Sequence, residues 1–492
     1  MKNSASENVN LPFLGEGIYA LILSLVYILS RLLFHLKGGY FNARPILFAK
    51  QYIDPVLLEN DLLASLFHLH SQPPFFNFFL GIVLKISPIP ALTFELLFKT
   101  AGLIMPILLF GILSMIGIKR LIAFLITLVF MFNPTLFLYE NLLYYTHFEA
   151  FFILSAIFFL LKWSLNSNTK DIIFFFLSLL CLGMIRSLFH PLFFFFLIII
   201  IAVFIYYKQK KQLSKIFVYA SFFVLIPLVL LCTKNLIVYD FFGTSSWTGM
   251  SLWIKTNTYL TEQLEEFETD KLISPLAVKA ELMTYKSITN YFNEKELKDI
   301  DCNHPADCEI LKSSDKPNYN HKGFVTLSKQ LLRDSFSLIR LNPKSFGFYT
   351  FGSYSLTLWH SSDSVHALFE DNMKILDQPE RFYRFLNFGF FGIKNRHSDS
   401  RLWIRTAFVS LFFLFFYAST LINLLKKEGS MPVAVKTVCL FCLVIHAYTI
   451  AVSSFIEFGE NNRFRFPVDP AFLVLMAGNI SCFFKKPRKK AN

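Results

Sequence analysis

Charged residues are scarce in this sequence. Asp, Glu, Lys and Arg make up 16% of its 492 residues, whereas a soluble chain of this size usually carries about a quarter. Glycine (19) and proline (20) are not enriched, and no heptad or triplet repeat is visible. Glycine-rich phosphate-binding patterns between a strand and a helix are also missing. Together these absences exclude most soluble classes, coiled coils, collagens and low-complexity disorder.

Hydrophobic residues fill the chain instead. They make up 54% of it and include 61 phenylalanines, and apolar stretches of bilayer-spanning length recur along almost the whole sequence. We therefore predict an all-α polytopic membrane protein with a bundle of 10–12 transmembrane helices. Pro88, Pro90 and Pro106 interrupt the pattern, so one stretch between 74 and 135 is predicted to be a half-span or re-entrant. The predicted spans are 11–36, 74–88, 92–116, 120–135, 147–164, 171–187, 188–207, 214–236, 402–425, 431–456 and 466–484.

The net charge of +13 arises from 47 Lys and Arg against 34 Asp and Glu. Most basic clusters lie beside predicted spans, where the positive-inside rule assigns them to the cytoplasm. This placement argues against a nucleic-acid partner and favours contact between a basic cytoplasmic C-terminus and anionic membrane lipids. The clusters are Lys208, Lys210, Lys211 and Lys215; Lys426 and Lys427; and Lys485, Lys486, Arg488, Lys489 and Lys490.

The distribution of polar residues predicts three regions. Residues 1–239 form an N-terminal transmembrane module, whose first external loop, about 37–74, holds one or two short interfacial helices. Residues 240–400 are polar and form an external insert, and residues 401–492 carry the last spans and the tail. The polar N-terminus has no cleavage-site pattern, so the first span is predicted to remain as an anchor.

Two of the seven cysteines stand apart. Cys302 and Cys308 lie in the polar segment "DCNHPADC", and on the external side they either close a small disulfide loop or remain thiols; spacing alone leaves both open. Cys439 and Cys442 form a CxxC pattern within an apolar run, where packing is the expected role. No disulfide framework follows from the other cysteines.

Ionisable residues at the external mouths of the spans are the candidates for chemistry, because such residues are costly near lipid and usually face a cavity. A loop rich in carboxylates opposite a loop rich in arginines suits a base that activates a nucleophile while cations hold a phosphate leaving group. The candidates are Asp54, Glu59, Asp61 and His70; Glu140, Tyr144 and Tyr145; Arg186 and His190; and Glu460, Asn461, Asn462, Arg463 and Arg465.

Several motifs carry a family resemblance. A first span, an acidic external loop and "HSQPP" opening the second span resemble the GT-C superfamily of membrane glycosyltransferases. The nearest branch contains the protein O-mannosyltransferases and the lipid A aminoarabinose transferases. "YIDPVLLENDLLASLFHLHSQPPFFNFFLG" and "ENNRFRFPVDP" also resemble a bacterial group in that branch. The resemblance spans the transmembrane body and reaches the insert only through "FFGTSSWTGMSLW".

The resemblance implies an inverting hexosyl- or pentosyltransferase that takes a sugar from a polyprenyl-phosphate-linked donor. The acceptor is a lipid, polysaccharide or protein that the sequence does not identify. The family's acidic residue maps onto Asp54, with Asp61 as second choice, and a later one onto Glu140. Arg463 and Arg465 would hold the carrier phosphate.

Cofactor and membrane follow less directly from the resemblance. Some relatives bind a divalent metal, which remains possible here, but no metal is assigned, since Asp54, Glu140 and His70 are the sole ligand candidates. The resemblance to a bacterial group favours the inner membrane. The ending "KKAN" has the form of a dilysine retrieval signal, so the endoplasmic reticulum is the alternative.

Structural roles compete with each catalytic candidate. Asp54 precedes a proline and suits a helix cap, and His70 equally suits a cap of the second span. Glu140 fits an interfacial carboxylate. Tyr144 and Tyr145 fit an aromatic belt at least as well as a sugar platform.

The arginines have structural alternatives too. Arg186 either snorkels to the interface or lines a pocket, and its place among apolar runs favours a pocket. Arg463 and Arg465 oppose the positive-inside trend, which favours an anionic ligand. The alternative is that they pair with Glu457 or Glu460.

Two other functions fit the same sequence. A transporter or lipid flippase would also gather charges inside a helical bundle, although transporters usually show two related halves and no internal repeat is visible here. A non-catalytic scaffold subunit would explain the polar insert but leaves the clustered acidic and arginine-rich loops without a role.

Overall fold

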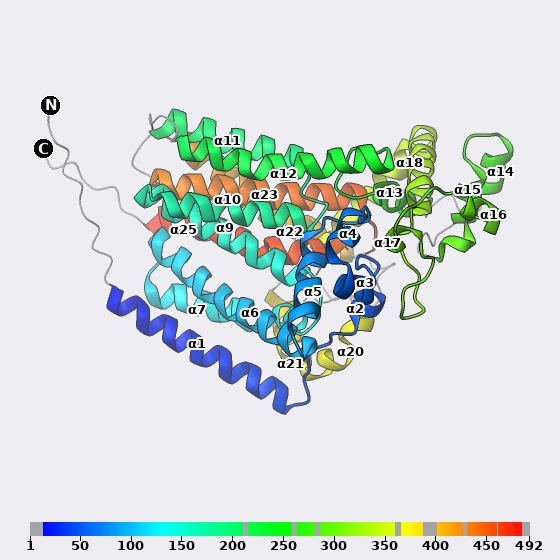
Figure 1. Ribbon diagram of the computed structural model, residues 1–492. Coiled ribbons are helices and arrows are strands. Elements are labelled where there is room, and N and C mark those ends of the chain that lie inside the picture. The colour runs from blue at the N-terminus through cyan, green and yellow to red at the C-terminus, as the bar shows by residue number, and fades with distance from the viewer. Residues whose placement is uncertain are drawn as a thin grey trace, which may run out of the picture.

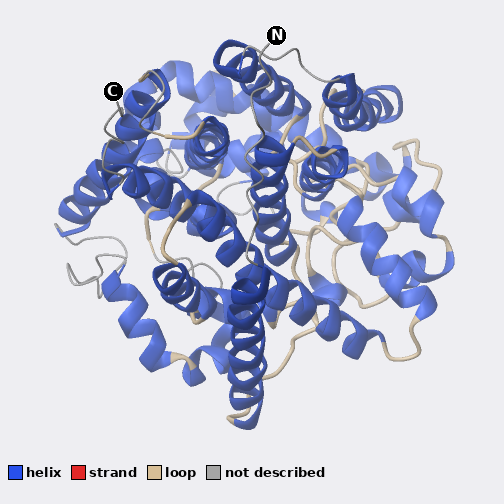
Figure 2. Ribbon diagram, turned by 90° about the vertical axis from the view of Figure 1, so that its left-hand side faces the viewer, coloured by secondary structure: helices blue, strands red, loops and turns tan. Residues whose placement is uncertain are grey.

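The computed structural model describes residues 13–209, 215–257, 263–280, 286–359, 366–386, 401–426, 431–459 and 461–484. Within these ranges every regular element is an α-helix or a short 3-10 helix, and the extended pairings are isolated bridges. Figure 2 shows helices and loops and no strand in this part of the chain. The prediction of an all-α protein is confirmed.

Long apolar helices form the body of the molecule. Seven described helices have at least 18 residues and are apolar enough to cross a membrane. They run side by side along the bundle in Figure 1, and many of their leucine and phenylalanine side chains point outward. The chain is therefore a polytopic membrane protein. The seven are α1 (Phe13–Leu36), α6 (Pro90–Ile116), α9 (Thr146–Asn166), α11 (Pro191–Gln209), α12 (Lys215–Tyr239), α22 (Arg401–Leu425) and α23 (Val433–Ile456).

Shorter helices complete the bundle. α10 (Thr169–Ile185) packs against α9 and α12, and α25 (Asp469–Phe484) packs against α23. α7 (Arg120–Met131) and α8 (Pro134–Glu140) form a pair bent by 56°, and α5 (Phe75–Ile86) has only 12 residues. α5 and α7 have 12 residues each, which is short for a span. The described residues thus contain seven long spans, or eight if the bent α7–α8 pair counts as one, and the number of 10–12 stays a prediction.

Prolines begin several of these helices rather than break them. Pro90, Pro134 and Pro191 are the first residues of α6, α8 and α11, where a missing N–H costs nothing. Pro106 lies inside the 27-residue helix α6, which continues past it and ends at a left-handed cap, Gly117, with a φ of 96°. Neighbouring helices in a membrane bundle allow such an interior proline. The sharp bend in the 74–135 region therefore falls between α7 and α8 instead.

The first loop contains three short helices, where one or two were predicted. They are α2 (Pro45–Phe48), α3 (Pro55–Asn60) and α4 (Leu62–Phe67). Asp54 caps α3 by accepting a hydrogen bond from the backbone N–H of Val56. The loop covers the ends of the spans beside α5 in Figure 1.

The polar region after α12 begins with a small helical unit. Its hydrophobic cluster includes Trp247, Met250, Trp253, Phe324 and Leu331, separate from the core of the bundle. It lies at the end of the bundle where α12 ends (Figure 1). Its elements are α13 (Thr248–Asn257), α14 (Leu264–Thr269), α15 (Pro275–Ala280), η2 (Ile288–Asn290), α16 (Glu294–Lys298), α17 (Pro305–Cys308) and α18 (Gly323–Leu341).

The rest of the predicted insert returns to the bundle. α19 (Pro343–Thr357) packs against α22 and α23, while α20 (His366–Ile375) and α21 (Asp377–Leu386) pack against α8. The two parts of the 240–400 region thus have different neighbours. The predicted domain boundaries stay a prediction.

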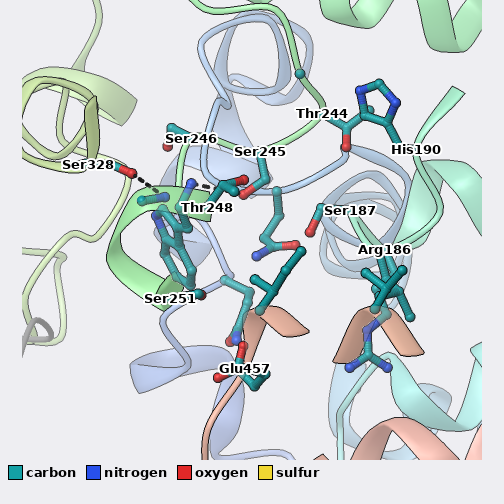
Figure 3. Close-up of a pocket in the computed structure, with 18 of the residues that line it drawn as sticks. Arg186, Ser187, His190, Thr244, Ser245, Ser246, Thr248, Ser251, Ser328 and Glu457 are labelled. Carbon is teal, nitrogen blue, oxygen red and sulfur yellow. Dashed lines mark hydrogen bonds between the residues drawn. The ribbon is translucent and has the colours of Figure 1, made fainter. Parts of the chain in front are cut away.

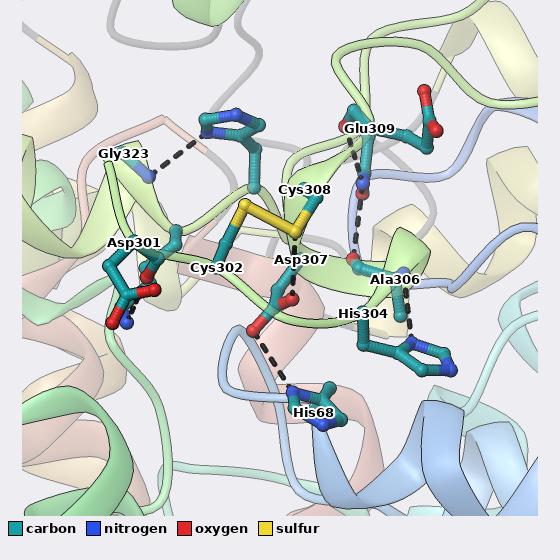
Figure 4. The surroundings of a disulfide bond; sticks show 12 residues. His68, Asp301, Cys302, His304, Ala306, Asp307, Cys308, Glu309 and Gly323 are labelled. Carbon is teal, nitrogen blue, oxygen red and sulfur yellow. Dashed lines mark hydrogen bonds and ion pairs between the residues drawn. A yellow bond between two sulfur atoms is a disulfide. The ribbon is translucent and has the colours of Figure 1, made fainter. Parts of the chain in front are cut away.

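Cys302 and Cys308 are joined by a disulfide, with 5.6 Å between their Cα atoms. Of the two possibilities that spacing left open, the bridge is the one present (Figure 4). The loop that it closes carries His304 and Asp307, which lie beside His68 of the first loop in this view.

Two imidazole–carboxylate pairs join that loop to the first loop. His304 Nε2 is 3.0 Å from Asp61 Oδ2, and His68 Nδ1 is 3.1 Å from Asp307 Oδ2. The two histidine rings stack with 4.9 Å between their centroids. Tyr239 at the end of α12 donates a hydrogen bond to Asp307 as well, at 2.8 Å. These contacts fix the helical unit against the first loop.

Candidate functional site

A cavity of about 670 Å³ lies where these polar segments meet the bundle. It is lined by residues of the first loop, the turn between α10 and α11, the segment leading into α13, α18, and the end of α23 with α24 (Asn461–Arg465). The segments are far apart in sequence. Figure 3 shows Arg186 on one side of the cavity and Ser245, Ser246 and Thr248 on the other, with Glu457 below these three.

Arg186 forms the cationic side of the cavity. The backbone leaves α10 in an extended conformation at this residue, and its side chain is 3% exposed. Its guanidinium lies 3.9 Å from the ring centroid of Phe464, and Nη1 pairs with Glu149 of α9. The other terminal nitrogen, Nη2, has no hydrogen-bond partner among the described residues, and neither has Glu149 Oε1. The pair therefore leaves one nitrogen and one oxygen without a partner in the described part of the chain, and Arg186 itself lines the cavity.

Arg463 lies next to this pair. Its Nη1 donates a hydrogen bond of 3.0 Å to the hydroxyl of Tyr144, whose ring stacks on Tyr145 with centroids 4.7 Å apart. Tyr145 lines the cavity, with its ring 5.6 Å from the guanidinium of Arg186. The structure thus brings together four of the predicted site residues as two arginines around a tyrosine pair.

The opposite wall is rich in hydroxyl groups. Ser245 donates a hydrogen bond to the carbonyl of Ser71 at 2.6 Å, and Ser328 Oγ accepts one from the N–H of Gly249 at 3.0 Å. Glycine is required at 249, since a Cβ there would lie 1.8 Å from the carbonyl oxygen of Ser328. The hydroxyl residues that line the cavity are Ser187, Thr244, Ser245, Ser246, Thr248, Ser251, Ser328 and Ser453.

This serine-rich wall was missed as a site by sequence reasoning. The segment "GTSSWTG" carries the signal, because it places several hydroxyl groups and two glycines at the start of a helix. It was used only as part of a family resemblance.

Glu457 is the one carboxylate among the described residues that line the cavity. It follows the last turn of α23 and is half-buried. Lys255 of α13 donates hydrogen bonds to the carbonyls of Ser454 and Phe455 in that turn. Burial lowers the pKa of Lys255 to about 7, and the nearby charge of Glu457 opposes this shift. Sequence reasoning treated Glu457 only as a partner for the arginines.

The three predicted carboxylates lie elsewhere. Asp54 accepts hydrogen bonds from the N–H and the hydroxyl of Ser313, at 2.5 and 2.7 Å, besides capping α3. Glu140 is fully buried and pairs with Arg31 of α1 at 2.7 Å. Asp61 contacts His304. None of the three lines the cavity, so their predicted catalytic roles remain predictions that the geometry does not favour.

The remaining predicted residues are spread around the cavity. Arg465 pairs with Asp469 at 2.8 Å and donates to the carbonyl of Leu358 at 2.8 Å, outside the cavity lining. Asn462 is buried beside Arg463 in α24 and does not line the cavity either. Glu460 lies outside the described residues.

Of the predicted histidines, His190 lines the cavity, and His70 contacts its wall. His70 is fully buried, and its Nδ1 is 2.9 Å from Ser246 Oγ. Asp54, Glu140 and His70, the candidate metal ligands, therefore each have separate partners. In the described part of the chain no three His, Cys, Asp or Glu side chains cluster as a metal site.

Comparison with known proteins leaves the family open. No family model, curated protein or solved structure matches the chain. What is established is a polytopic all-α membrane protein with a polar cavity at one end of its helical bundle.

Proposed function

We propose that the protein is a glycosyltransferase that moves a sugar from a polyprenyl-phosphate carrier to an acceptor at the outer face of the membrane. In bacteria this membrane is the inner membrane, whose outer face borders the periplasm. The observation that carries the proposal is the incomplete pair of Arg186 and Glu149 beside Arg463. A buried guanidinium nitrogen without a partner is costly, and a phosphate oxygen would complete it with a strong, charge-assisted hydrogen bond.

The surroundings of the arginines fit a lipid-linked sugar. Leu188, Tyr448, Val452 and Ile456 line the cavity from the turn before α11 and from α23, so that a carrier head group can enter while its hydrocarbon tail stays in the bilayer. Tyr145 and the hydroxyl wall supply a ring face and hydrogen-bonding groups for a sugar. No nucleotide-binding fold is needed for such a donor.

The chemistry requires one base and one anion site. Glu457 takes the proton of an acceptor hydroxyl while the oxygen forms a bond to the anomeric carbon of the sugar. The bond between that carbon and the phosphate oxygen breaks, and its electron pair leaves with the phosphate. Arg186 and Arg463 stabilise the phosphate as charge develops on it. Attack opposite to the leaving group inverts the anomeric configuration.

The proposal is tested with purified protein in proteoliposomes supplied with radiolabelled polyprenyl-phosphate sugars and a panel of acceptors. Transfer of label supports the enzyme. Movement of the labelled lipid across the bilayer without transfer would replace it with a flippase.

Glu457→Gln tests the base and has a matched control in Asp54→Asn. We expect Glu457→Gln to lower the transfer rate by about 10²–10⁴-fold with donor affinity retained. Asp54→Asn keeps a good helix cap and should leave transfer near the wild-type rate. The reverse result would return the catalytic role to Asp54.

A further inference from the structure

His70 is held rigidly by neighbours from three segments. Its backbone N–H donates to Asn320 Oδ1 at 3.0 Å, and its carbonyl accepts the N–H of Ser246 at 2.9 Å. Its ring lies 4.6 Å from the ring of Tyr239. The imidazole therefore has one fixed orientation relative to the serine-rich wall.

The two ring nitrogens of His70 differ sharply. Nδ1 is 2.9 Å from Ser246 Oγ, whereas Nε2 is buried without a hydrogen-bond partner among the described residues. Burial and then the charge of Lys234 lower the pKa of His70 to about 3, so the ring is neutral at physiological pH. It then carries a single N–H proton, on one nitrogen or the other.

The surroundings decide which nitrogen carries the proton. A proton on Nε2 would be a buried donor without an acceptor, in the positive field of Lys234 and Lys322. A proton on Nδ1 is donated to Ser246 Oγ, and the bare Nε2 is favoured by the same positive field. We assign the proton to Nδ1.

This assignment sets the direction of the Ser246 hydroxyl. Because Ser246 Oγ accepts a hydrogen bond from His70, its own proton must be donated elsewhere. Ser246 is 9% exposed and lines the cavity, on the side away from Arg186 in Figure 3. The serine is therefore a hydrogen-bond donor into the cavity.

Two neighbours make this side favourable for negative charge. α13 begins at Thr248, so the positive end of the dipole of a ten-residue helix faces the same wall. Lys329 also lines the cavity, although Asp240 pairs with it at 2.9 Å. Glu457, the one carboxylate among the described residues that line the cavity, is drawn below Ser246 and Thr248 in Figure 3.

We propose that Ser246 belongs to a second oxyanion site, which binds a phosphate or carboxylate group of the acceptor substrate, and that His70 is the positioning residue that keeps the serine a donor. The first oxyanion site is the donor-phosphate site at Arg186. Only the identification of the ligand as the acceptor substrate rests on the proposed function. The second site itself rests on the contacts of Ser246 and His70.

Calorimetric titration of the purified full-length protein tests the second site. The probes are glycerol phosphate, glycerate and glycerol, which share a carbon skeleton and differ in charge. The titrations use an Arg186→Gln background, which weakens the first site. We expect glycerol phosphate, glycerate or both to bind this background, and glycerol to bind at least tenfold more weakly.

Four variants in that background assign the residues. Ser246→Ala should weaken anion binding by about tenfold or more, whereas Ser246→Thr keeps the donor and the binding. His70→Asn places an amide N–H where Nδ1 lies and should retain binding. His70→Gln places its amide near the Nε2 position and should weaken binding as Ser246→Ala does. Thermal unfolding of each variant confirms that it is folded.

Several outcomes would overturn the second site. These are loss of all anion binding in Arg186→Gln, equal binding of glycerol and the anions, or unchanged binding in Ser246→Ala. Covalent labelling of Ser246 by a fluorophosphonate would show that the serine gives its proton to His70, and would overturn the donor assignment. Absence of sugar transfer with anion binding at Ser246 intact would instead refute the proposed function alone.

Discussion

Two buried arginine–glutamate pairs lie inside this bundle, and they differ in how completely they are satisfied. Arg31 bonds both oxygens of Glu140, at 3.0 and 2.7 Å, and also contacts Ser30 Oγ and the carbonyl of Met131. Its guanidinium also lies 4.2 and 3.8 Å from the ring centroids of Tyr27 and Phe137. This pair is closed.

The second pair is open. Arg186 uses one terminal nitrogen for Glu149, and the remaining Nη2 and Oε1 atoms have no partner among the described residues. Only this pair contributes a residue to the cavity lining. Buried polar groups are normally satisfied, so an incomplete pair beside a cavity indicates a ligand, whereas a complete pair indicates structure.

Breaking the closed pair should have the largest effect. Glu140→Ala leaves the Arg31 charge buried without a carboxylate and should lower the free energy of unfolding by about 3–5 kcal/mol. Thermal unfolding in detergent measures this loss. The double variant Arg31→Met, Glu140→Met is the control and should recover most of the stability. A stable Glu140→Ala protein without transferase activity would contradict the structural role and favour the catalytic one.

Changing the open pair should affect the ligand more than the fold. Arg186→Gln, Glu149→Gln removes both charges together and should weaken binding of a polyprenyl phosphate by roughly 10- to 100-fold, as expected for a lost charge-assisted hydrogen bond. In wild type the same lipid should raise the unfolding temperature, and in the double variant it should not. Equal stabilisation of both proteins would place the phosphate elsewhere.

His70 is also partly satisfied, since Nδ1 is hydrogen-bonded to Ser246 and Nε2 has no partner among the described residues. Its folded pKa of about 3 lies below the ordinary value of 6.5, so the unfolded chain takes up a proton first as the pH falls. Its contribution to stability is complete above pH 6.5 and is lost as the pH falls toward 3. Between pH 6.5 and 5 we expect a loss of up to about 2 kcal/mol.

Chemical denaturation at the two pH values measures this loss, and His70→Asn is the matched variant. The substituted protein should lose less stability on acidification than wild type. The same acid sensitivity in both proteins would show that other groups cause it.

The Asp54 carboxylate lies near the surface and has hydrogen-bond partners for both of its oxygens. Its substitution should have the smallest effect on stability. Asp54→Ala removes the cap of α3 and the contacts to Ser313, and should cost about 1 kcal/mol. Asp54→Asn keeps the cap and should cost less. Unfolding of the two variants under one condition checks this order, which a larger loss in Asp54→Asn would reverse.

Much of the fold follows from local sequence patterns. Apolar runs of sufficient length predict the long helices, and prolines at 90, 134 and 191 mark where three helices begin. The completeness of an ion pair does not follow from such patterns. Arg31 and Glu140 are 109 residues apart, and Arg186 and Glu149 are 37 apart.

The candidate site was therefore predicted in part. The arginines and tyrosines at the mouths of spans were identified because charge is costly near lipid, and four of them do gather around the cavity. Glu140 was identified as a candidate acid, Glu149 was not considered, and Glu457 was considered only as a partner for the arginines. Only the fold shows that Glu457 lines the cavity and that Glu149 pairs with Arg186. The serine-rich wall was not identified, because candidates were selected mainly as charged residues at the mouths of spans.

The central claim is that the open pair binds a phosphate while the closed pair does not. A cryo-electron microscopy structure of the protein in nanodiscs containing a polyprenyl phosphate tests it most directly. We predict density for the phosphate in the cavity, with an oxygen about 3 Å from Arg186 Nη2. A phosphate bound at Asp54 or beside Arg31, with the cavity next to Arg186 empty, would contradict the claim.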